Sequence, residues 1–217
     1  MIKNILHTPL LAAAIIGALI FLVLRELKFF KTRPLLKAIM GVMLAFYCIT
    51  APSIPLYIMA IGFVFSALGD FLLDIPDDKG FLLGLFAFFA AHIAFLVFLW
   101  PHMTPLAQLG TAKLGSFGLL FVSNTWFYLW LRPSLDSSLR IPVAAYSTII
   151  ALMGMAAIGT TLPSYLVPLG AALFIASDVV LAIEKFKAKF PFAKTLNWLL
   201  YASGQIILAI GVVITAT

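Results

Sequence analysis

The stretch GFVFSALGDFLLD, residues 62–74, carries Asp70 and Asp74 inside a long apolar segment. An ionisable side chain within a membrane span costs at least ~2.5 kcal/mol, so such a residue marks a functional site by default. The stretch has an echo 108 residues later, where identical residues recur as the pairs Gly62 and Gly170, Asp70 and Asp178, Leu73 and Leu181, and Ile75 and Ile183. The sequence therefore predicts two equivalent apolar helices that each bury one aspartate, Asp70 or Asp178.

The composition is that of a membrane protein. The chain has 217 residues, of which 64% are hydrophobic and only 10% are charged, and its mean hydropathy is +1.14. Soluble domains contain about 25% charged residues, and a membrane span needs ~20 consecutive apolar residues. Apolar runs fill nearly the whole length, so we expect an all-α, polytopic membrane protein with one transmembrane domain over residues 1–217. The single cysteine, Cys48, excludes an intramolecular disulfide.

Eight transmembrane helices are predicted, at residues 6–24, 34–50, 55–75, 80–100, 113–131, 141–159, 163–183 and 195–215. Proline is tolerated at the first turn of a helix, and four prolines fall at or near such positions: Pro34, Pro55, Pro142 and Pro163. The first apolar run is interpreted as a helix rather than a signal peptide, because a basic loop and another apolar run follow it. An even number of helices separates the two aspartate helices, which indicates a parallel four-plus-four internal repeat.

The basic residues indicate the orientation. Of the 14 Lys and Arg residues, 11 lie in or beside the loops that follow the first, third, fifth and seventh helices. Positive residues favour the cytoplasmic side. These loops are therefore predicted to be cytoplasmic, with both termini on the other side of a bacterial inner membrane. The net charge of +6 is then an orientation signal that also attracts anionic membrane lipids, and no nucleic-acid partner is needed to explain it.

Further polar side chains are predicted to gather near the two aspartates, in the cytoplasmic half of the helices. Asp70 and Asp178 each lie five residues before the predicted end of their helix, which places them at one depth. The other candidates, all for substrate binding, are Arg33, Lys37, Asp74, His92, Asn124, Tyr128, Tyr146, Ser177, Asn197, Tyr201 and Gln205.

Several candidates also have simpler explanations. Lys37 can extend to the cytoplasmic surface, and Asp74 is near enough to the boundary to be a solvated helix end. Ser177 and Asn124 can form hydrogen bonds that only join helices. A lone histidine such as His92 is more often a satisfied core residue than a ligand. The sequence leaves these alternatives open.

Paired aspartates suit one class of chemistry. Two carboxyl groups held close in a low-dielectric site do not both ionise easily, so a protonated acid is expected beside an ionised base. Such a pair suits hydrolysis through an oxocarbenium-like intermediate, and the sequence does not assign the two roles. No metal or cofactor is predicted, because only His92 of the three histidines lies deep and no HExxH, Gly-x-Ser-x-Gly or P-loop pattern occurs.

A set of motifs resembles one family along nearly the whole chain. The motifs are Arg33-Pro34, Phe65 to Leu73, Phe81 to Gly84, Ala91-His92, Gly170-Ala171, Leu173 to Ala182, Leu200-Tyr201 and Gln205. This pattern resembles the YhhN-like lysoplasmalogenase family, and the Gly-Asp and Ser-Asp helices are its most specific part. Two positions depart from the family pattern, which usually has lysine in place of Arg33 and alanine in place of Gly204.

The resemblance implies an eight-span membrane hydrolase whose substrate is a lysophospholipid. It would cleave the vinyl ether bond of lysoplasmalogens and release a fatty aldehyde and a glycerophospho head group. Asp70 and Asp178 would divide the acid and base roles, and Arg33 and Lys37 would meet the phosphate. The alternatives are a secondary transporter that uses the same buried carboxylates, or a lipid-binding membrane protein.

Overall fold

The computed structural model describes residues 2–25, 32–51, 56–75 and 78–215. Within these residues the chain forms eight α-helices: α1 (Ile2–Leu24), α2 (Arg33–Ile49), α3 (Tyr57–Leu73), α4 (Asp78–Leu99), α5 (Thr111–Leu131), α6 (Ser137–Gly159), α7 (Leu166–Phe186) and α8 (Ala193–Thr215). Three 3-10 helices lie in the connections beside α5: η1 (Trp100–His102), η2 (Leu106–Gln108) and η3 (Arg132–Ser134). The all-α prediction is confirmed, and each helix lies close to its predicted range.

The prolines mark the helix ends less closely than predicted. Pro34 lies in the first turn of α2, as expected. Pro142 lies inside α6, because this helix begins one turn earlier than the sequence predicted. Pro163 precedes α7, and Pro55 lies outside the described residues.

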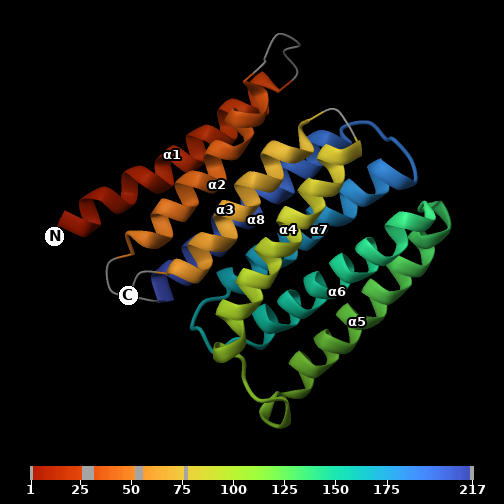
Figure 1. Cartoon of the computed structure of the whole chain (residues 1–217). Coiled ribbons are helices and arrows are strands. Elements are labelled where there is room, and N and C mark those ends of the chain that lie inside the picture. Colours follow the sequence, from red (N-terminus) through yellow and green to blue (C-terminus); the bar gives the residue numbers. More distant parts are fainter. Residues whose placement is uncertain (1, 26–31, 52–55, 76–77, 216–217) are drawn as a thin grey trace.

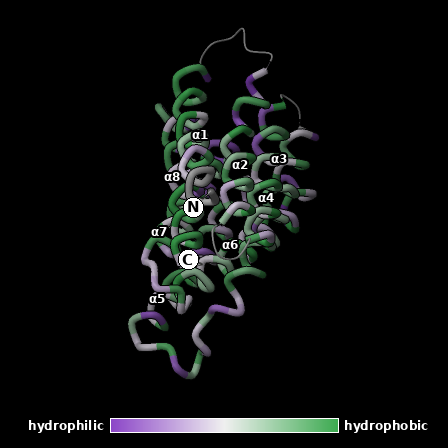
Figure 2. Tube along the Cα trace, turned by 90° about the vertical axis from the view of Figure 1, so that its left-hand side faces the viewer, coloured by the Kyte–Doolittle hydropathy of each residue, from purple (hydrophilic) through white to green (hydrophobic). Residues whose placement is uncertain are grey.

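Five of the described helices, α4 to α8, are long and apolar enough to cross a membrane. Shorter apolar helices occupy Thr8–Leu24 and Tyr57–Leu73. Figure 2 shows that the middle of the bundle is mostly hydrophobic, with hydrophilic residues more frequent toward its ends. The chain is therefore an integral membrane protein, and the crossing of all eight helices stays a prediction.

The helices form a bundle with α5 at one edge and α1 near the other (Figure 1). Helix α3 packs against α2 and α4, and α8 packs against α7, α2 and α1. Helix α6 contacts α4, α7 and α5. Both termini lie at one end of the bundle (Figure 1), so the C-terminal ends of α3 and α7, which follow the two aspartates, lie at the opposite end.

Close contact between α7 and α8 depends on glycine. A Cβ atom placed on Gly170 would lie 2.5 Å from the backbone nitrogen of Leu208 and 2.8 Å from the carbonyl oxygen of Gly204. These are backbone atoms, which cannot turn aside as a side chain can. Small residues at such positions let membrane helices approach closely, so Gly170 and Gly204 set the spacing of α7 and α8.

Gly170→Ala is expected to destabilise the protein by roughly 1–3 kcal/mol, the usual effect of overpacking a tight interface. The measurement is the unfolding midpoint in detergent. Gly115→Ala in α5 is the matched control, because no atom lies within 4 Å of the added Cβ. The control is expected to keep the midpoint or raise it slightly. Equal midpoints for Gly170→Ala and the unmodified protein would contradict the close α7–α8 contact.

Candidate active site

Asp70 lies in α3 with both carboxyl oxygens engaged. The Nζ atom of Lys37, from α2, lies 3.4 Å from Oδ1, and the hydroxyl of Tyr201, from α8, donates to Oδ2 at 2.7 Å. The residue is only 1% exposed. The cationic Lys37 and the tyrosine donor both favour the ionised form of this carboxyl group.

Asp178 lies in α7 in a different environment. The hydroxyl of Tyr146, from α6, interacts electrostatically with its carboxyl group. The Nε2 atom of His92, from α4, lies 3.7 Å from Oδ2, which is too long for a direct hydrogen bond. These two facing atoms are both buried, and neither has a hydrogen-bond partner among the residues that the structure describes.

His92 is oriented by its other ring nitrogen. Its Nδ1 atom lies 2.7 Å from the carbonyl oxygen of Phe88. A carbonyl oxygen only accepts, so Nδ1 carries a hydrogen and the neutral ring presents an unprotonated Nε2 to Asp178. A bare carboxylate opposite that lone pair would be repelled. The pair therefore holds one proton, either on Asp178 or on His92.

The two aspartates have equivalent partners. Asp70 meets side chains from α2 and α8, and Asp178 meets side chains from α6 and α4. If α1–α4 and α5–α8 are two copies, these are corresponding helices. Lys37 and Tyr146 are 109 residues apart, and so are His92 and Tyr201, which is one residue more than the 108 that separate Asp70 from Asp178.

Aromatic rings join the two aspartate environments. The ring of Phe174 packs on His92 with centroids 4.6 Å apart and on Tyr201 at 5.4 Å. Phe88 packs edge-on against Tyr201 at 5.7 Å. Tyr201, the partner of Asp70, also interacts electrostatically with Asp178 and Tyr146. The site thus consists of two aspartates, each with its own polar partners, and an aromatic cluster that contacts the partners of both.

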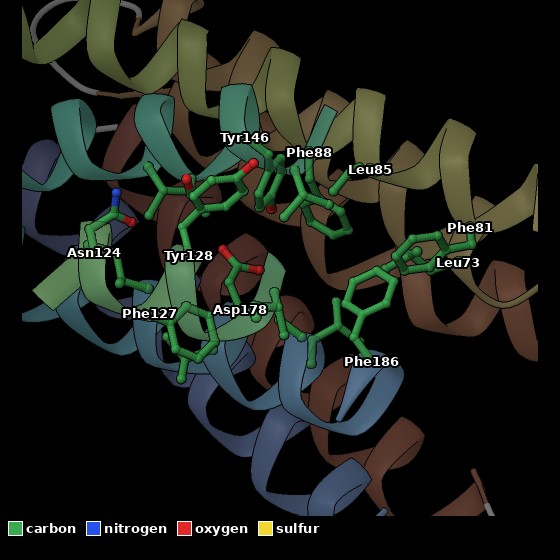
Figure 3. A pocket seen from close by; sticks show the side chains of 18 residues that line it. Leu73, Phe81, Leu85, Phe88, Asn124, Phe127, Tyr128, Tyr146, Asp178 and Phe186 are labelled. Carbon is green, nitrogen blue, oxygen red and sulfur yellow. The ribbon is translucent and has the colours of Figure 1, made fainter. Parts of the chain in front are cut away.

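Asp178 opens into an apolar cavity between α4, α5, α6 and α7. The cavity encloses about 740 Å³ of empty space, including its open mouth. Figure 3 shows the Asp178 carboxyl group near its middle, with Asn124 toward one end and Phe81 and Phe186 toward the other. Its polar lining consists of Asn124, Tyr128, Tyr146, Ser147 and Asp178, and the rest is apolar. A lining that is apolar apart from a few polar groups suits an apolar chain with one polar end.

A second, larger opening, called here the basic vestibule, lies at the end of the bundle where α3 and α7 end. It encloses about 1660 Å³, including open solvent. The charged residues that line it are Arg25, Arg33, Lys37, Asp74, Glu184, Lys185, Lys189 and Lys194. Leu73, Phe81 and Leu181 line both the vestibule and the apolar cavity, so these three side chains separate the two.

The predicted binding residues are divided between these spaces. Asn124, Tyr128 and Tyr146 line the cavity with Asp178. Arg33, Lys37, Asp74 and Asn197 line the vestibule, where Arg33 forms an ion pair of 3.0 Å with Asp74. Asp70, His92 and Tyr201 line neither space within the described part of the chain and lie behind the walls.

Two predicted binding residues, Ser177 and Gln205, hydrogen-bond inside the bundle and are not in the described lining of either space. The Ser177 hydroxyl donates to the Phe174 carbonyl of its own helix at 2.7 Å. The Gln205 amide donates to the Ser66 hydroxyl at 3.1 Å and so ties α8 to α3. Asn197 donates to the Ser177 carbonyl at 2.7 Å, although it also reaches the vestibule. The equal depth predicted for the aspartates has no support from the helix ends, since α7 continues to Phe186 while α3 stops at Leu73.

Sequence reasoning missed the loop cations and the separating side chains. Lys189 and Lys194 were interpreted only as orientation signals, although both line the vestibule. The sequence alone does not show that they line a cavity, because a loop lysine beside a cavity and a loop lysine in open solvent have the same sequence pattern. Among the described residues, no three His, Cys, Asp or Glu side chains gather as metal ligands.

Comparison with known proteins agrees with the sequence pattern. The model of the YhhN family matches residues 32–212. "Lysoplasmalogenase" of Mycobacterium bovis is 29% identical over 188 residues, which cover 82% of this chain and 69% of that protein. "Lysoplasmalogenase TMEM86A" of Bos taurus is 31% identical, over 70% of this chain and 64% of its own length. "Lysoplasmalogenase TMEM86B" of Sus scrofa is 33% identical, over 68% and 59%.

No solved structure matches the chain. The family model spans most of the sequence, including both aspartate helices and their partners on α2, α4, α6 and α8. The resemblance predicted from the motifs is therefore confirmed, and the chain belongs to the YhhN family.

Proposed function

We propose that this protein is a membrane-embedded hydrolase that cleaves the vinyl ether bond of lysoplasmalogens to a fatty aldehyde and a glycerophospho head group. The relatives named lysoplasmalogenase support the reaction class. One observation carries the site: Asp178, with an unpaired oxygen facing His92, opens into a cavity that is apolar elsewhere. The alkenyl chain would occupy that cavity, and the head group would lie in the vestibule.

The hydrogen bonds support an assignment of the two aspartates. The neutral His92 ring presents its unprotonated Nε2 to Asp178, so the one proton of this pair is placed on Asp178, which makes Asp178 the general acid. Asp70 is ionised and bonded to Tyr201, which also interacts with Asp178. Asp70 is too buried to meet water directly, so it acts as a base through the Tyr201 hydroxyl, which reaches the cavity once the wall at Phe88 opens.

The proposed steps balance. Asp178 gives its proton to the vinyl carbon that is not bonded to the ether oxygen. A C–H bond forms there, and the other vinyl carbon and the ether oxygen become an oxocarbenium ion. Water adds to that ion while its proton passes to the Tyr201 oxygen and the tyrosine proton passes to Asp70. The resulting hemiacetal then loses its hydroxyl proton to Asp178, and the departing glycerol oxygen takes a proton back through Tyr201. The products are an aldehyde and an alcohol, and both aspartates return to their starting forms.

The experiment uses purified protein in detergent with a 1-alkenyl lysophospholipid, and it measures aldehyde release. Saturated 1-alkyl lysophospholipid is the matched control, because it lacks the double bond that must be protonated. Release from the alkenyl lipid alone is the expected result. If neither lipid yields aldehyde and proteoliposomes take up the lipid, the protein is instead a transporter.

We also propose that all eight helices cross the membrane, as two parallel repeats of four, with the vestibule on the cytoplasmic side. The equivalent partners of Asp70 and Asp178 support the repeat, and the loop cations support the orientation. In a Cys48→Ala background, Lys113→Cys is expected to react with an impermeant thiol reagent in intact cells. Lys189→Cys is expected to react only after lysis, and the reverse order would overturn the orientation.

A further inference from the structure

A third opening, called here the α5–α6 groove, lies where the end of α5 meets the start of α6. It encloses about 850 Å³, including open solvent, and shares no lining residue with the basic vestibule. The residues that line it are Tyr128, Arg132, Ser137, Arg140, Ile141, Ala144, Ala145 and Thr148. Two of these described residues carry a positive charge and none carries a negative one, so the lining does not balance its own charge.

The two arginines come from different elements. Arg132 begins η3, directly after α5, and Arg140 lies in the first turn of α6. Both are exposed, and neither forms an ion pair with any residue that the structure describes. The acid between them in the sequence, Asp136, is exposed and does not line the groove. A guanidinium group binds a phosphate through two parallel hydrogen bonds, so both arginines are available to a phosphate from outside the chain.

The rest of the groove is mainly an apolar strip of α6. Ile141, Ala144, Ala145 and Thr148 follow one another at i, i+3, i+4 and i+7, so they share one face of the helix. Thr148 donates its hydroxyl to the carbonyl oxygen of Ala144 at 2.8 Å, which satisfies its polar atom within the helix. Ile141 is 79% exposed. The strip extends for about 10 Å along α6, away from Arg140 and into the apolar part of the helix.

We infer that the α5–α6 groove binds an anionic diacyl phospholipid, with the phosphate on Arg132 and Arg140 and one acyl chain along the apolar strip of α6. A free phosphate would leave the strip uncovered. A zwitterionic lipid would bring an amine cation that meets no carboxylate among the described lining residues. In the orientation proposed above, the groove faces the cytoplasmic leaflet, where basic pockets between membrane helices recur as sites for anionic head groups.

The bound lipid would fix the position of α5. This helix packs mainly on α6 and is otherwise largely exposed. A phosphate shared by Arg132 and Arg140 ties the end of α5 to the start of α6, beside the hydrogen bond of 3.1 Å that the Tyr128 hydroxyl donates to the Arg140 carbonyl. Tyr128 also lines the apolar cavity that holds Asp178, so the lipid stabilises one wall of that cavity.

The test measures the unfolding midpoint of the purified protein in a non-ionic detergent, with dioleoyl phosphatidylglycerol, dioleoyl phosphatidylcholine or glycerol 3-phosphate added. Phosphatidylglycerol is expected to raise the midpoint by about 5 °C, and the other two are expected to leave it unchanged. An equal rise with glycerol 3-phosphate would show a site for a free anion, and an equal rise with phosphatidylcholine would show that the charge is not recognised. Either result overturns the proposal. The measurement needs no turnover, so it is independent of the proposed reaction.

Single variants test the two arginines. Arg132→Gln and Arg140→Gln are each expected to raise the phosphatidylglycerol concentration that gives half of the shift about 10-fold. Lys79→Gln is the matched control, because Lys79 is an exposed cation at the same end of the bundle that does not line the groove. If the control weakens the response as much as the arginine variants, the lipid is attracted only by the overall charge of this end, and the site is rejected.

Hydrogen exchange locates the bound lipid. Phosphatidylglycerol is expected to slow the exchange of backbone amides within residues 128–148, which contain the groove, in the unmodified protein and not in Arg140→Gln. Slower exchange at the ends of α3 and α7 alone would place the lipid in the vestibule instead. That result, or equal protection in the two proteins, contradicts a lipid site between α5 and α6.

Discussion

Asp178→Asn is expected to lower kcat for 1-alkenyl lysophospholipid hydrolysis by about 1,000-fold, within the range of general acid catalysis. Asparagine has nearly the same shape and keeps a polar group beside Tyr146, but it holds no proton that it can give to carbon. KM is expected to change little, because the residue contributes one polar group to an otherwise apolar cavity. The assay is aldehyde release under substrate saturation, with the unfolding midpoint measured on the same sample.

Asp136→Asn is the matched control for this change. Asp136 is an exposed residue at the start of α6 whose side chain makes no capping hydrogen bond. The same chemical change there is expected to leave kcat intact. If Asp178→Asn retains kcat within 10-fold of the control, the general acid is another group and the assignment of Asp178 is wrong.

His92→Phe tests separately whether His92 influences the proton on Asp178. Phenylalanine keeps the ring packing on Phe174 and removes both nitrogens. A lower kcat together with a displaced pH profile is expected, because Asp178 then holds its proton without the histidine. A lower kcat with an unchanged pH profile would reduce His92 to a packing residue.

The helices could be predicted from the sequence because each contains a long apolar run, which sets its approximate limits. The two aspartates were identified for the related reason that a carboxyl group in such a run is costly. The helix starts were less certain. The sequence places Pro142 at the first turn of its helix, yet α6 begins a turn earlier, since polar residues from Ser137 onward extend the helix beyond its apolar part.

The pairing of side chains could not be predicted. Lys37, Tyr146, His92 and Tyr201 were all expected near the aspartates, but their assignment to Asp70 or Asp178 depends on helix order and rotation, which hydropathy does not encode. Ser177 shows the same limit. A serine in an apolar helix reads the same whether it faces a cavity or, as here, bonds to its own backbone.

Asp70→Asn is expected to lower kcat about 100-fold, and it is also expected to destabilise the protein by about 3 kcal/mol because Lys37 loses the carboxylate beside it. These two effects must be separated, since a poorly folded enzyme is also a slow one. The double variant Asp70→Asn with Lys37→Met removes both charges at once. Its unfolding midpoint is expected to recover toward that of the unmodified protein, since no buried charge is left unpaired.

The activity of that double variant decides the role of Asp70. If Asp70 takes a proton through Tyr201, kcat stays low although the fold is restored, because an amide cannot take that proton. Lys37→Met alone completes the cycle and isolates the interaction between the two residues. Recovery of kcat in the double variant, in step with the midpoint, would mean that Asp70 only neutralises Lys37. The base would then have to be sought on the cavity side. Among the described residues that line the cavity, Asp178 is the one acid, and its carboxylate, left after the first proton transfer, already faces the substrate.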